Sequence, residues 1–380
     1  MISKTKSGLF IREDKNLGLM VYSPYTGLFF CCVEEEKEMK HLLFWLNGKT
    51  KEPLSDKYLQ SIGAGWCYPR DKVRHHGTYV LSTKNEGIQR WPEKPLLVNW
   101  IITGQCNYHC IYCYAQDLMH QHQKEPEKGL VLQTAENILS YSPLAVVLTG
   151  GEPLCSPNLD VVIKTLHNKT GIIIDTNGSL VSKNHVDLFK KYNIFVRVSL
   201  DSEQPRKNQI LRPSRNEKNT LEKALHCIKL CNDADVPVGV QTVITRKNMS
   251  DVISIRDTLH RIGGVKIWRL LLLTEHSAFP SYKQWKPNEK RFYQKIAKEV
   301  KSGSDNTMSI QIVHSNAPDA VILVSQNGHF MTEKEGGKIP IDKNSSYKPS
   351  LQSFKDVIDR AAHLNRYLNS TDIPATYIGK

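Results

Sequence analysis

The sequence predicts an α/β protein whose centre is a partial (β/α)6 TIM-like barrel, with a small α+β module on either side. Between residues 93 and 275, six short apolar runs alternate with runs of helical period. This alternation is typical of parallel βα units. The apolar runs contain few polar residues, as expected for a sheet that is covered on both faces. Several glycine-rich or polar motifs follow these runs, at the strand ends where barrels of this class carry their functional residues.

The barrel elements are expected in strict alternation along residues 93–275. The strands are expected at 96–102, 145–148, 171–174, 194–200, 236–243 and 265–273. The helices are expected at 134–140, 159–167, 183–192, 219–233 and 249–262.

Residues 1–92 are expected to form a separate N-terminal module of mixed α+β structure. Strand-like runs at 8–12, 17–22 and 27–33 precede a helical run at 37–46. Asn47-Gly48 follows that run, and these residue types readily take the positive φ that ends a helix.

Residues 276–380 are expected to form a C-terminal extension of different character. A helix is expected at 287–300, followed by strands at 309–313, 320–324 and 329–332 and a last helix at 354–368. Asn327-Gly328 is a strong hairpin signal between the second and third of these strands.

Composition limits the class of protein. The 380 residues contain 40% hydrophobic and 23% charged residues, which is typical of a folded globular chain. We find neither a run of ~20 apolar residues that could span a membrane nor an N-terminal signal peptide, so a cytoplasmic protein is expected. The net charge of +13 favours acidic partners but fits a solvated basic surface equally well.

The nine cysteines do not resemble the disulfide framework of a secreted protein, because their number is odd and the chain is long. Cys227 and Cys231 lie four residues apart in a helical run and are expected in the core. Cys31 and Cys32 lie in a strand-like run, where packing explains them.

Cys106, Cys110 and Cys113 form a C-x3-C-x2-C pattern directly after the first barrel strand. Three nearby thiolates can hold three corners of a cubane [4Fe-4S] cluster and leave one iron without a protein ligand. A zinc site is the alternative, but it needs four ligands, and three thiols with His109 would be an unusual set.

Together with Thr149-Gly150-Gly151-Glu152-Pro153 one strand later, this pattern resembles the radical S-adenosylmethionine superfamily, and the resemblance runs from about residue 100 to 245. The resemblance implies that the three cysteines ligate the cluster. It implies that S-adenosylmethionine chelates the open iron through its amino and carboxylate groups. One electron from the reduced cluster then cleaves a C–S bond of the sulfonium, giving methionine and a 5′-deoxyadenosyl radical.

The resemblance also assigns binding roles for S-adenosylmethionine. It implies that the aromatic residue before the third cysteine contacts the adenine and that the Gly-Gly-Glu-Pro segment contacts the amino group. Residues at the ends of later strands would contact the ribose, the carboxylate or the substrate. A turn or a helix N-cap is the alternative explanation for several of these residues. The implied cofactor-binding residues are Tyr112, Gly150, Gly151, Glu152, Pro153, Asn177, Ser199, Asp201, Arg212 and Gln241.

Arg212 departs from the pattern of peptide-modifying relatives, in which His-Asp precedes the arginine and glycine follows it. Here Asn208-Gln209 stands at the first place and Pro213 at the second, so this assignment has the least support. No catalytic acid or base is identified.

The flanking modules resemble parts of peptide-modifying members. Residues 22–27 and 44–48 resemble a leader-peptide recognition domain, which captures a peptide as an added strand, and a structural cap is the alternative. Residues 320–332 resemble the hairpin that opens a cluster-binding C-terminal extension. No cysteine follows Cys231, so a cluster-free remnant covering the barrel mouth is expected.

These observations predict a radical enzyme with a [4Fe-4S] cluster and S-adenosylmethionine that modifies a peptide or protein. A flavodoxin or ferredoxin is the electron donor that the resemblance implies. A radical enzyme acting on a nucleotide or RNA is one alternative, and a non-catalytic iron–sulfur sensing protein is another. The sequence leaves open the substrate, the reaction outcome, whether S-adenosylmethionine is consumed, and the oligomeric state.

Overall fold

The computed structural model describes residues 2–5, 8–14, 18–32, 93–121, 124–273, 275, 281–294, 308–313, 320–334, 337–358 and 363. The helix expected at 37–46 and the recognition-like segment 44–48 lie outside the described residues. So do the second halves of the helices expected at 287–300 and 354–368, apart from a few positions.

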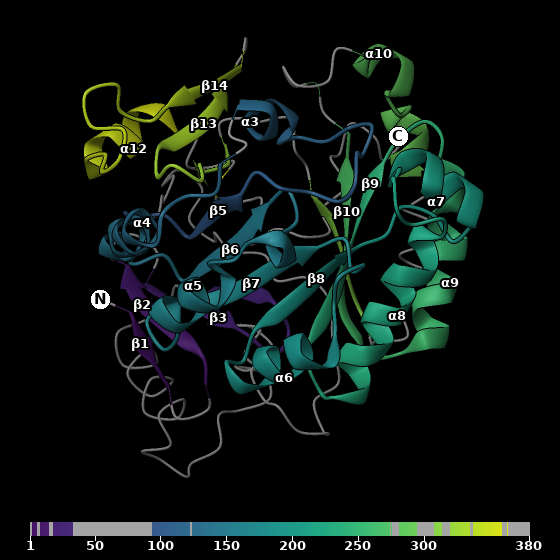
Figure 1. The fold of residues 1–380 in the computed structure, drawn as a ribbon, viewed down its shortest axis with the longest axis horizontal. Coiled ribbons are helices and arrows are strands. Elements are labelled where there is room, and N and C mark those ends of the chain that lie inside the picture. Colours follow the sequence, from purple (N-terminus) through teal and green to yellow (C-terminus); the bar gives the residue numbers. More distant parts are fainter. Residues whose placement is uncertain are drawn as a thin grey trace.

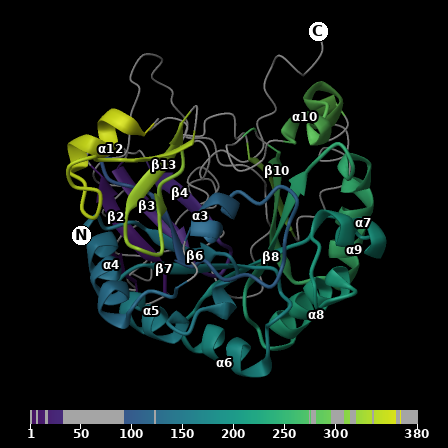
Figure 2. The same ribbon diagram turned by 45° about the horizontal axis from the view of Figure 1, so that its top comes forward.

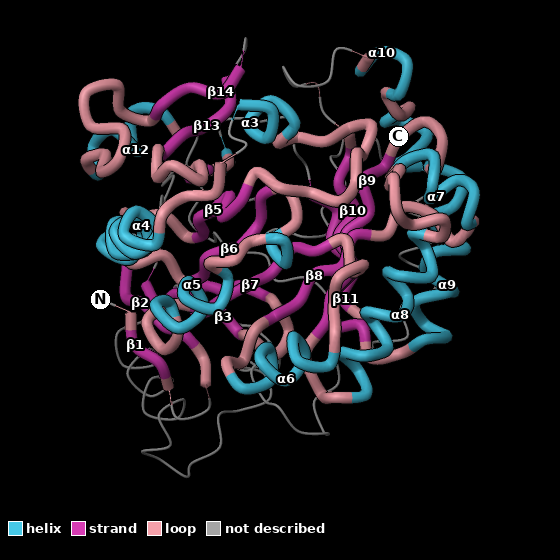
Figure 3. The backbone as a smooth tube through the Cα atoms, in the orientation of Figure 1, coloured by secondary structure: helices cyan, strands magenta, loops and turns pink. Residues whose placement is uncertain are grey.

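The central part is a curved parallel sheet with helices on its outer face, which confirms the predicted fold class (Figures 1 and 3). The six barrel strands are hydrogen-bonded to one another in chain order, each parallel to the next. They are β5 (Leu97–Thr103), β6 (Ala145–Gly150), β7 (Gly171–Thr176), β8 (Phe195–Ser199), β9 (Val238–Ile244) and β10 (Val265–Leu272).

The helices form an arc around the outside of this sheet (Figure 2). The five expected helices are present, and α4 begins six residues earlier than its apolar period suggested. They are α4 (Lys128–Ser140), α5 (Leu159–Leu166), α6 (Lys183–Lys191), α8 (Thr220–Asp233) and α9 (Val252–Ile262). The shorter α3 (Gln116–Gln121), α7 (Pro205–Leu211) and α10 (Tyr282–Trp285) were not expected.

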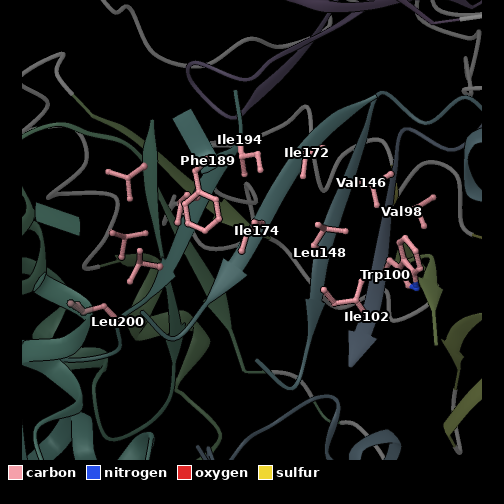
Figure 4. Close-up of a cluster of buried hydrophobic side chains, with 14 of the residues drawn as sticks. Val98, Trp100, Ile102, Val146, Leu148, Ile172, Ile174, Phe189, Ile194 and Leu200 are labelled. Carbon is pink, nitrogen blue, oxygen red and sulfur yellow. The ribbon is translucent and has the colours of Figure 1, made fainter. Parts of the chain in front are cut away.

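Strand alternation separates two apolar layers, because successive side chains of a strand point to opposite faces. One set faces the helices and forms the main core, as Figure 4 shows for Trp100, Leu148 and Ile174. The other set faces the barrel interior. Near the amino ends of the strands this inner set is apolar and includes Phe195 and Ile267.

The N-terminal strands form a separate antiparallel sheet of four strands at the base of the barrel. Phe10, Met20 and Tyr22 of this sheet share one buried cluster with Phe195 and Ile267 of the barrel. The sheet therefore closes the barrel at the end away from the sequence motifs. Its strands are β1 (Ser3–Lys4), β2 (Phe10–Asp14), β3 (Gly18–Ser23) and β4 (Leu28–Cys32).

The C-terminal strands extend the barrel sheet at both ends rather than forming a separate layer. β11 (Ser309–Val313) pairs in parallel with β10, and β12 (Leu323–Val324) pairs in parallel with β5. A hairpin of β13 (Phe330–Lys334) and β14 (Gly337–Pro340) continues from β12, and α12 (Leu351–Val357) follows. Phe330 and Phe354 join the main core, so this extension packs as part of the barrel.

None of the described helices has both the length and the apolar character needed to cross a membrane.

Candidate functional site

The predicted site residues gather around one cavity of about 340 Å³ at the carboxyl ends of the barrel strands. Its lining includes all three cysteines of the motif and eight of the ten residues assigned to cofactor binding. The other two, Pro153 and Asp201, are buried beside it. The eight are Tyr112, Gly150, Gly151, Glu152, Asn177, Ser199, Arg212 and Gln241.

The loop that carries the three cysteines, residues 106–113, is here called the thiol loop. The chain after α7 runs beside it and binds its backbone: the His109 amide donates to the Pro213 carbonyl at 2.7 Å, and the Ile111 amide donates to the Leu211 carbonyl at 3.2 Å. The Ser214 hydroxyl donates to the Asn107 carbonyl at 3.1 Å. The loop is therefore held by backbone contacts that need no cofactor.

Two side chains link the thiol loop to the end of β7. The Asn177 amide donates to Asn107 Oδ1 at 2.8 Å, and the Asn107 amide donates to the Ser179 hydroxyl at 2.7 Å. Asn177 was assigned to cofactor binding, and the structure shows that its side chain already serves the loop. Its position in the cavity lining still leaves it beside any bound ligand.

Gly150 and Gly151 allow the end of β6 to pack directly against the backbone that leads into the thiol loop. A Cβ atom on Gly151 would lie 2.1 Å from the Gln105 carbonyl oxygen, and one on Gly150 would lie 2.4 Å from that of Thr103. Gly150 also has a φ of 142°, which side chains rarely permit. These two positions require glycine for the protein's own packing, whatever ligand lies nearby.

Glu152 is a fully buried carboxylate between β6 and β7. It accepts hydrogen bonds from the backbone amide of Asn177 at 2.7 Å, the Thr176 hydroxyl at 2.8 Å and the backbone amide of Leu154 at 3.2 Å. Burial nevertheless raises its pKa from 4.5 to about 7, because these bonds only partly replace water. A cationic group in the cavity would favour the ionised form.

Asp201, Arg212 and Tyr112 form one buried network behind the thiol loop. The Tyr112 hydroxyl donates to Asp201 Oδ2, and Arg212 Nη1 contacts the same oxygen at 3.3 Å and the Tyr112 hydroxyl at 3.1 Å. The Val243 amide donates to Asp201 Oδ1 at 2.8 Å. Asp201 is completely buried, so its side chain serves this network rather than the cavity.

Arg212 has one side-chain donor that takes no part in this network. Its Nε is buried and has no hydrogen-bond partner among the described residues, although Arg212 lines the cavity. The nearby Cys110 and Asp201 raise the pKa of this guanidinium above its usual value despite its burial.

The sequence reasoning identified only Gln241 of a belt of polar side chains in the barrel interior, which also contains Asp175, Arg197 and Arg269. Asp175 and Arg197 form a two-point ion pair, with Nε–Oδ1 at 2.5 Å and Nη2–Oδ2 at 2.9 Å. Gln241 Oε1 accepts from Arg269 Nη1 at 3.2 Å. Barrel interiors are usually filled by branched aliphatic side chains, whereas these side chains give the cavity a polar lining. A signal was available, because Asp175, Arg197 and Arg269 are charged residues in mostly apolar strands.

The three thiols fit an iron–sulfur cluster. They come from one loop and line one cavity. Among the described residues no three His, Cys, Asp or Glu side chains are close enough to hold a single metal ion. A cluster is larger than an ion and separates its cysteines further, so thiols spread around a cavity suit it.

Comparison with known proteins identifies the central part of the chain. Residues 100–259 match the sequence profile of the Radical SAM superfamily. Fe-coproporphyrin III synthase of Methanosarcina barkeri is 28% identical over 205 residues, which are 53% of this chain and 50% of that protein. GTP 3′,8-cyclase of Helicobacter pylori is 32% identical over 141 residues, which are 34% of this chain and 42% of that protein. The chain thus spans about half the length of these curated relatives.

Among solved structures, Streptococcus suis SuiB bound to precursor peptide SuiA has a similar fold. The TM-score is 0.58, the alignment covers 87% of this chain and 82% of that chain, and the sequences are 12% identical. At this identity the likeness shows the fold alone. It extends well beyond residues 100–259, so it includes parts of the flanking modules.

Proposed function

Because the chain belongs to the radical SAM superfamily through residues 100–259, we propose that it is a radical enzyme that modifies a peptide or protein. The superfamily implies a [4Fe-4S] cluster and S-adenosylmethionine as cofactors. The observation that carries the proposal is one cavity, lined by three thiols of one loop, by Gly150, Gly151 and Glu152, and by the inner polar belt. Cluster, cofactor and substrate would therefore meet in one chamber.

The chain would contribute binding and orientation, while the cofactors supply the redox chemistry. Cys106, Cys110 and Cys113 would hold the cluster, which with S-adenosylmethionine and an electron from a flavodoxin or ferredoxin would supply a 5′-deoxyadenosyl radical and methionine. Glu152 would accept a hydrogen bond from the cofactor's ammonium group. Ser199, the last residue of β8, would contact the ribose or carboxylate, and Gln241, in the middle of β9, would contact the cofactor or the substrate.

The polar belt would orient the substrate below the cofactor. Arg197 uses Nε and Nη2 for Asp175, and Nη1 has no partner among the described residues, so it can donate to a carbonyl or carboxylate in the cavity. The amide nitrogen of Gln241 is left for a ligand because its oxygen accepts from Arg269. A peptide offers carbonyl groups that match such donors.

A peptide or protein substrate is supported by the fold. The solved relative named above was crystallised with its precursor peptide, and its likeness covers most of this chain. The curated relatives are a synthase named for Fe-coproporphyrin III and a cyclase named for GTP, and they match only about half of their own length. A tetrapyrrole or a nucleotide is therefore the alternative class of substrate.

The test is anaerobic reconstitution with iron and sulfide, followed by dithionite and S-adenosylmethionine. We expect a brown protein that releases 5′-deoxyadenosine, and we expect Cys110→Ala to lose both the colour and the release. Cys155→Ala is the matched control, because Cys155 is also a free cysteine but lies outside the cavity lining. A coloured, active Cys110→Ala protein would overturn the ligand assignment, and zinc in place of iron would overturn the proposed function.

The substrate class can be tested with the same protein. A precursor peptide encoded beside the gene should change in mass in the presence of S-adenosylmethionine, whereas coproporphyrin and GTP should not. A change in either small molecule, with none in the peptide, would move the assignment to the alternative class.

A further inference from the structure

The C-terminal hairpin contacts the segment that follows the thiol loop. β14 lies beside α3 (Figure 1), and α3 begins three residues after Cys113. The contact is made by Lys338, whose side chain is 3% exposed. The two residues that it contacts, Tyr114 and Asp117, are close in sequence to Cys113, the last cysteine of the motif.

All three donors of the Lys338 ammonium are directed at this segment. Nζ lies 2.8 Å and 3.0 Å from the two carboxylate oxygens of Asp117 and 2.8 Å from the Tyr114 carbonyl oxygen. It also lies 4.3 Å from the centre of the Tyr114 ring, where a cation is attracted to the π-electrons. A lysine is rarely buried unless its charge is paired in this way.

The hairpin reaches this place because it is anchored in the barrel. β12 pairs with β5, and Phe330 of β13 is fully buried in the main core. Glu333, directly across the hairpin from Lys338, lines the cavity. The β13–β14 hairpin therefore contributes to the cavity wall and also contacts the chain beside Cys113.

From these contacts we propose that Lys338 is a positioning residue that holds the thiol loop in the conformation that binds the cluster. This inference deepens the proposed function and rests on it. It gives the cysteine-free C-terminal extension a definite role: its buried cation fixes Tyr114 and Asp117, and through them the place of Cys113.

The test compares Lys338→Met with Lys338→Arg and with Lys348→Met. Lys348 is an exposed lysine of the same extension and serves as the matched control. In metal-free protein, backbone hydrogen exchange of residues 106–121 should become faster in Lys338→Met and unchanged in the control. After reconstitution, the retention of iron by Lys338→Met should weaken by about tenfold, as for other residues that orient metal ligands. Lys338→Arg should restore most of it.

A second measurement separates positioning of the loop from general stability. Loss of a cation beside the cluster disfavours an added electron, so the midpoint potential of the cluster in Lys338→Met should be more negative than in wild type. If Lys338→Met does not fold, Lys338→Met with Asp117→Asn removes the unpaired carboxylate, and the same measurements are made on that protein. Unchanged hydrogen exchange and iron retention in the folded variant would overturn the inference.

The outcomes also distinguish this inference from the proposed function. A wild-type protein that assembles no cluster would contradict the proposed function. In that case the exchange measurement in metal-free protein still decides whether Lys338 holds the thiol loop.

Discussion

The charged side chains around the site are buried, and their hydrogen-bond partners differ from residue to residue. Asp201 and Arg212 are joined in a network that is closed by Tyr112. Glu152 has hydrogen-bond donors around it, but among the described residues these donors are two backbone amides and a hydroxyl, and none is a cationic side chain. Since a buried carboxylate without a cation is costly to ionise, Glu152 should dominate the pH dependence of this region.

We predict that the contribution of Glu152 to stability falls as pH rises in the protein free of iron and S-adenosylmethionine. Its pKa is 4.5 in ordinary surroundings and about 7 in the fold, because of burial. The folded protein thus holds this proton more tightly than the unfolded chain, so the free energy of unfolding declines between these pH values, by about 3 kcal/mol in total. Urea unfolding of wild type and Glu152→Gln across that range measures the difference.

The difference between the two proteins isolates this group, because the variant has no titrating side chain at position 152. A difference in unfolding free energy that stays constant between pH 4.5 and 7 would show that burial does not control this carboxylate.

At the residue scale, the sequence predicted the groups that occur as local motifs. Cys106, Cys110 and Cys113 are within eight residues of one another, and the glycines and Glu152 are consecutive. Asp175 and Arg197 were missed because their pairing depends on the register of two adjacent strands. Lys338 was missed because its partner Asp117 is 221 residues away. Contacts set by sheet register or distant packing leave no local pattern to read.

At the scale of secondary structure elements, the end of β6 determines how closely the thiol loop approaches the sheet. The Gly151 amide donates to the Thr103 carbonyl at 3.0 Å, and the Glu152 amide donates to the Gln105 carbonyl at 2.8 Å. These two bonds continue the pairing of β5 and β6 beyond their last regular residues. The position of the loop therefore depends on backbone approach that only a residue without a side chain allows.

We predict that Gly151→Ala displaces the thiol loop and weakens cluster binding. The added methyl group would lie 2.1 Å from the Gln105 carbonyl oxygen and 2.9 Å from Cys106 Cβ, so backbone has to move. The variant should lose about 2 kcal/mol of unfolding free energy and most of its iron after reconstitution. Thermal unfolding and iron analysis measure the two effects.

Gly129→Ala is the control for this substitution. Gly129 lies in α4 with nothing within 4 Å of an added Cβ, so alanine should raise stability by up to about 1 kcal/mol. Equal iron retention in the two alanine variants would contradict the role of Gly151.

The elements themselves were predictable where they are long and apolar. All six barrel strands were placed within about two residues of their observed bounds, because their β-branched runs are strong signals. α7 was missed because its seven residues, Pro205–Leu211, are mostly polar and give no apolar period. β12 has two residues and exists only through pairing with β5 and β13.

At the scale of the whole molecule, a buried arginine connects the N-terminal sheet to the barrel. Arg12 of β2 donates to the Ser142 carbonyl at 2.6 Å and to the Pro95 carbonyl at 2.8 Å through Nη1, and to the Lys94 carbonyl at 3.2 Å through Nη2. Its side chain is 1% exposed, and burial lowers its pKa to about 10. Arg12 thus links the sheet to the barrel through hydrogen bonds to carbonyl groups that come together only in the folded protein.

We predict that Arg12→Met loosens the N-terminal sheet from the barrel. Three carbonyl groups would lose their donor and Asp14 would lose its cation, so the unfolding free energy should fall by about 3 kcal/mol. Limited proteolysis should cut the variant between the sheet and β5 faster than wild type. Lys183→Met, at an exposed position of α6, should change stability by less than about 0.5 kcal/mol. Similar cleavage rates in both variants would contradict the role of Arg12.

The filled base of the barrel also affects the order in which molecules enter and leave. Tyr22 and Phe10 of the N-terminal sheet fill the base of the barrel with Phe195, so a ligand that reaches Arg197 cannot leave through this end. In a cavity that is closed at its base, the ligand that binds deeper binds first and dissociates last. A substrate that contacts Arg197 would therefore have to bind before S-adenosylmethionine binds above it. Steady-state kinetics should then show a compulsory order of binding.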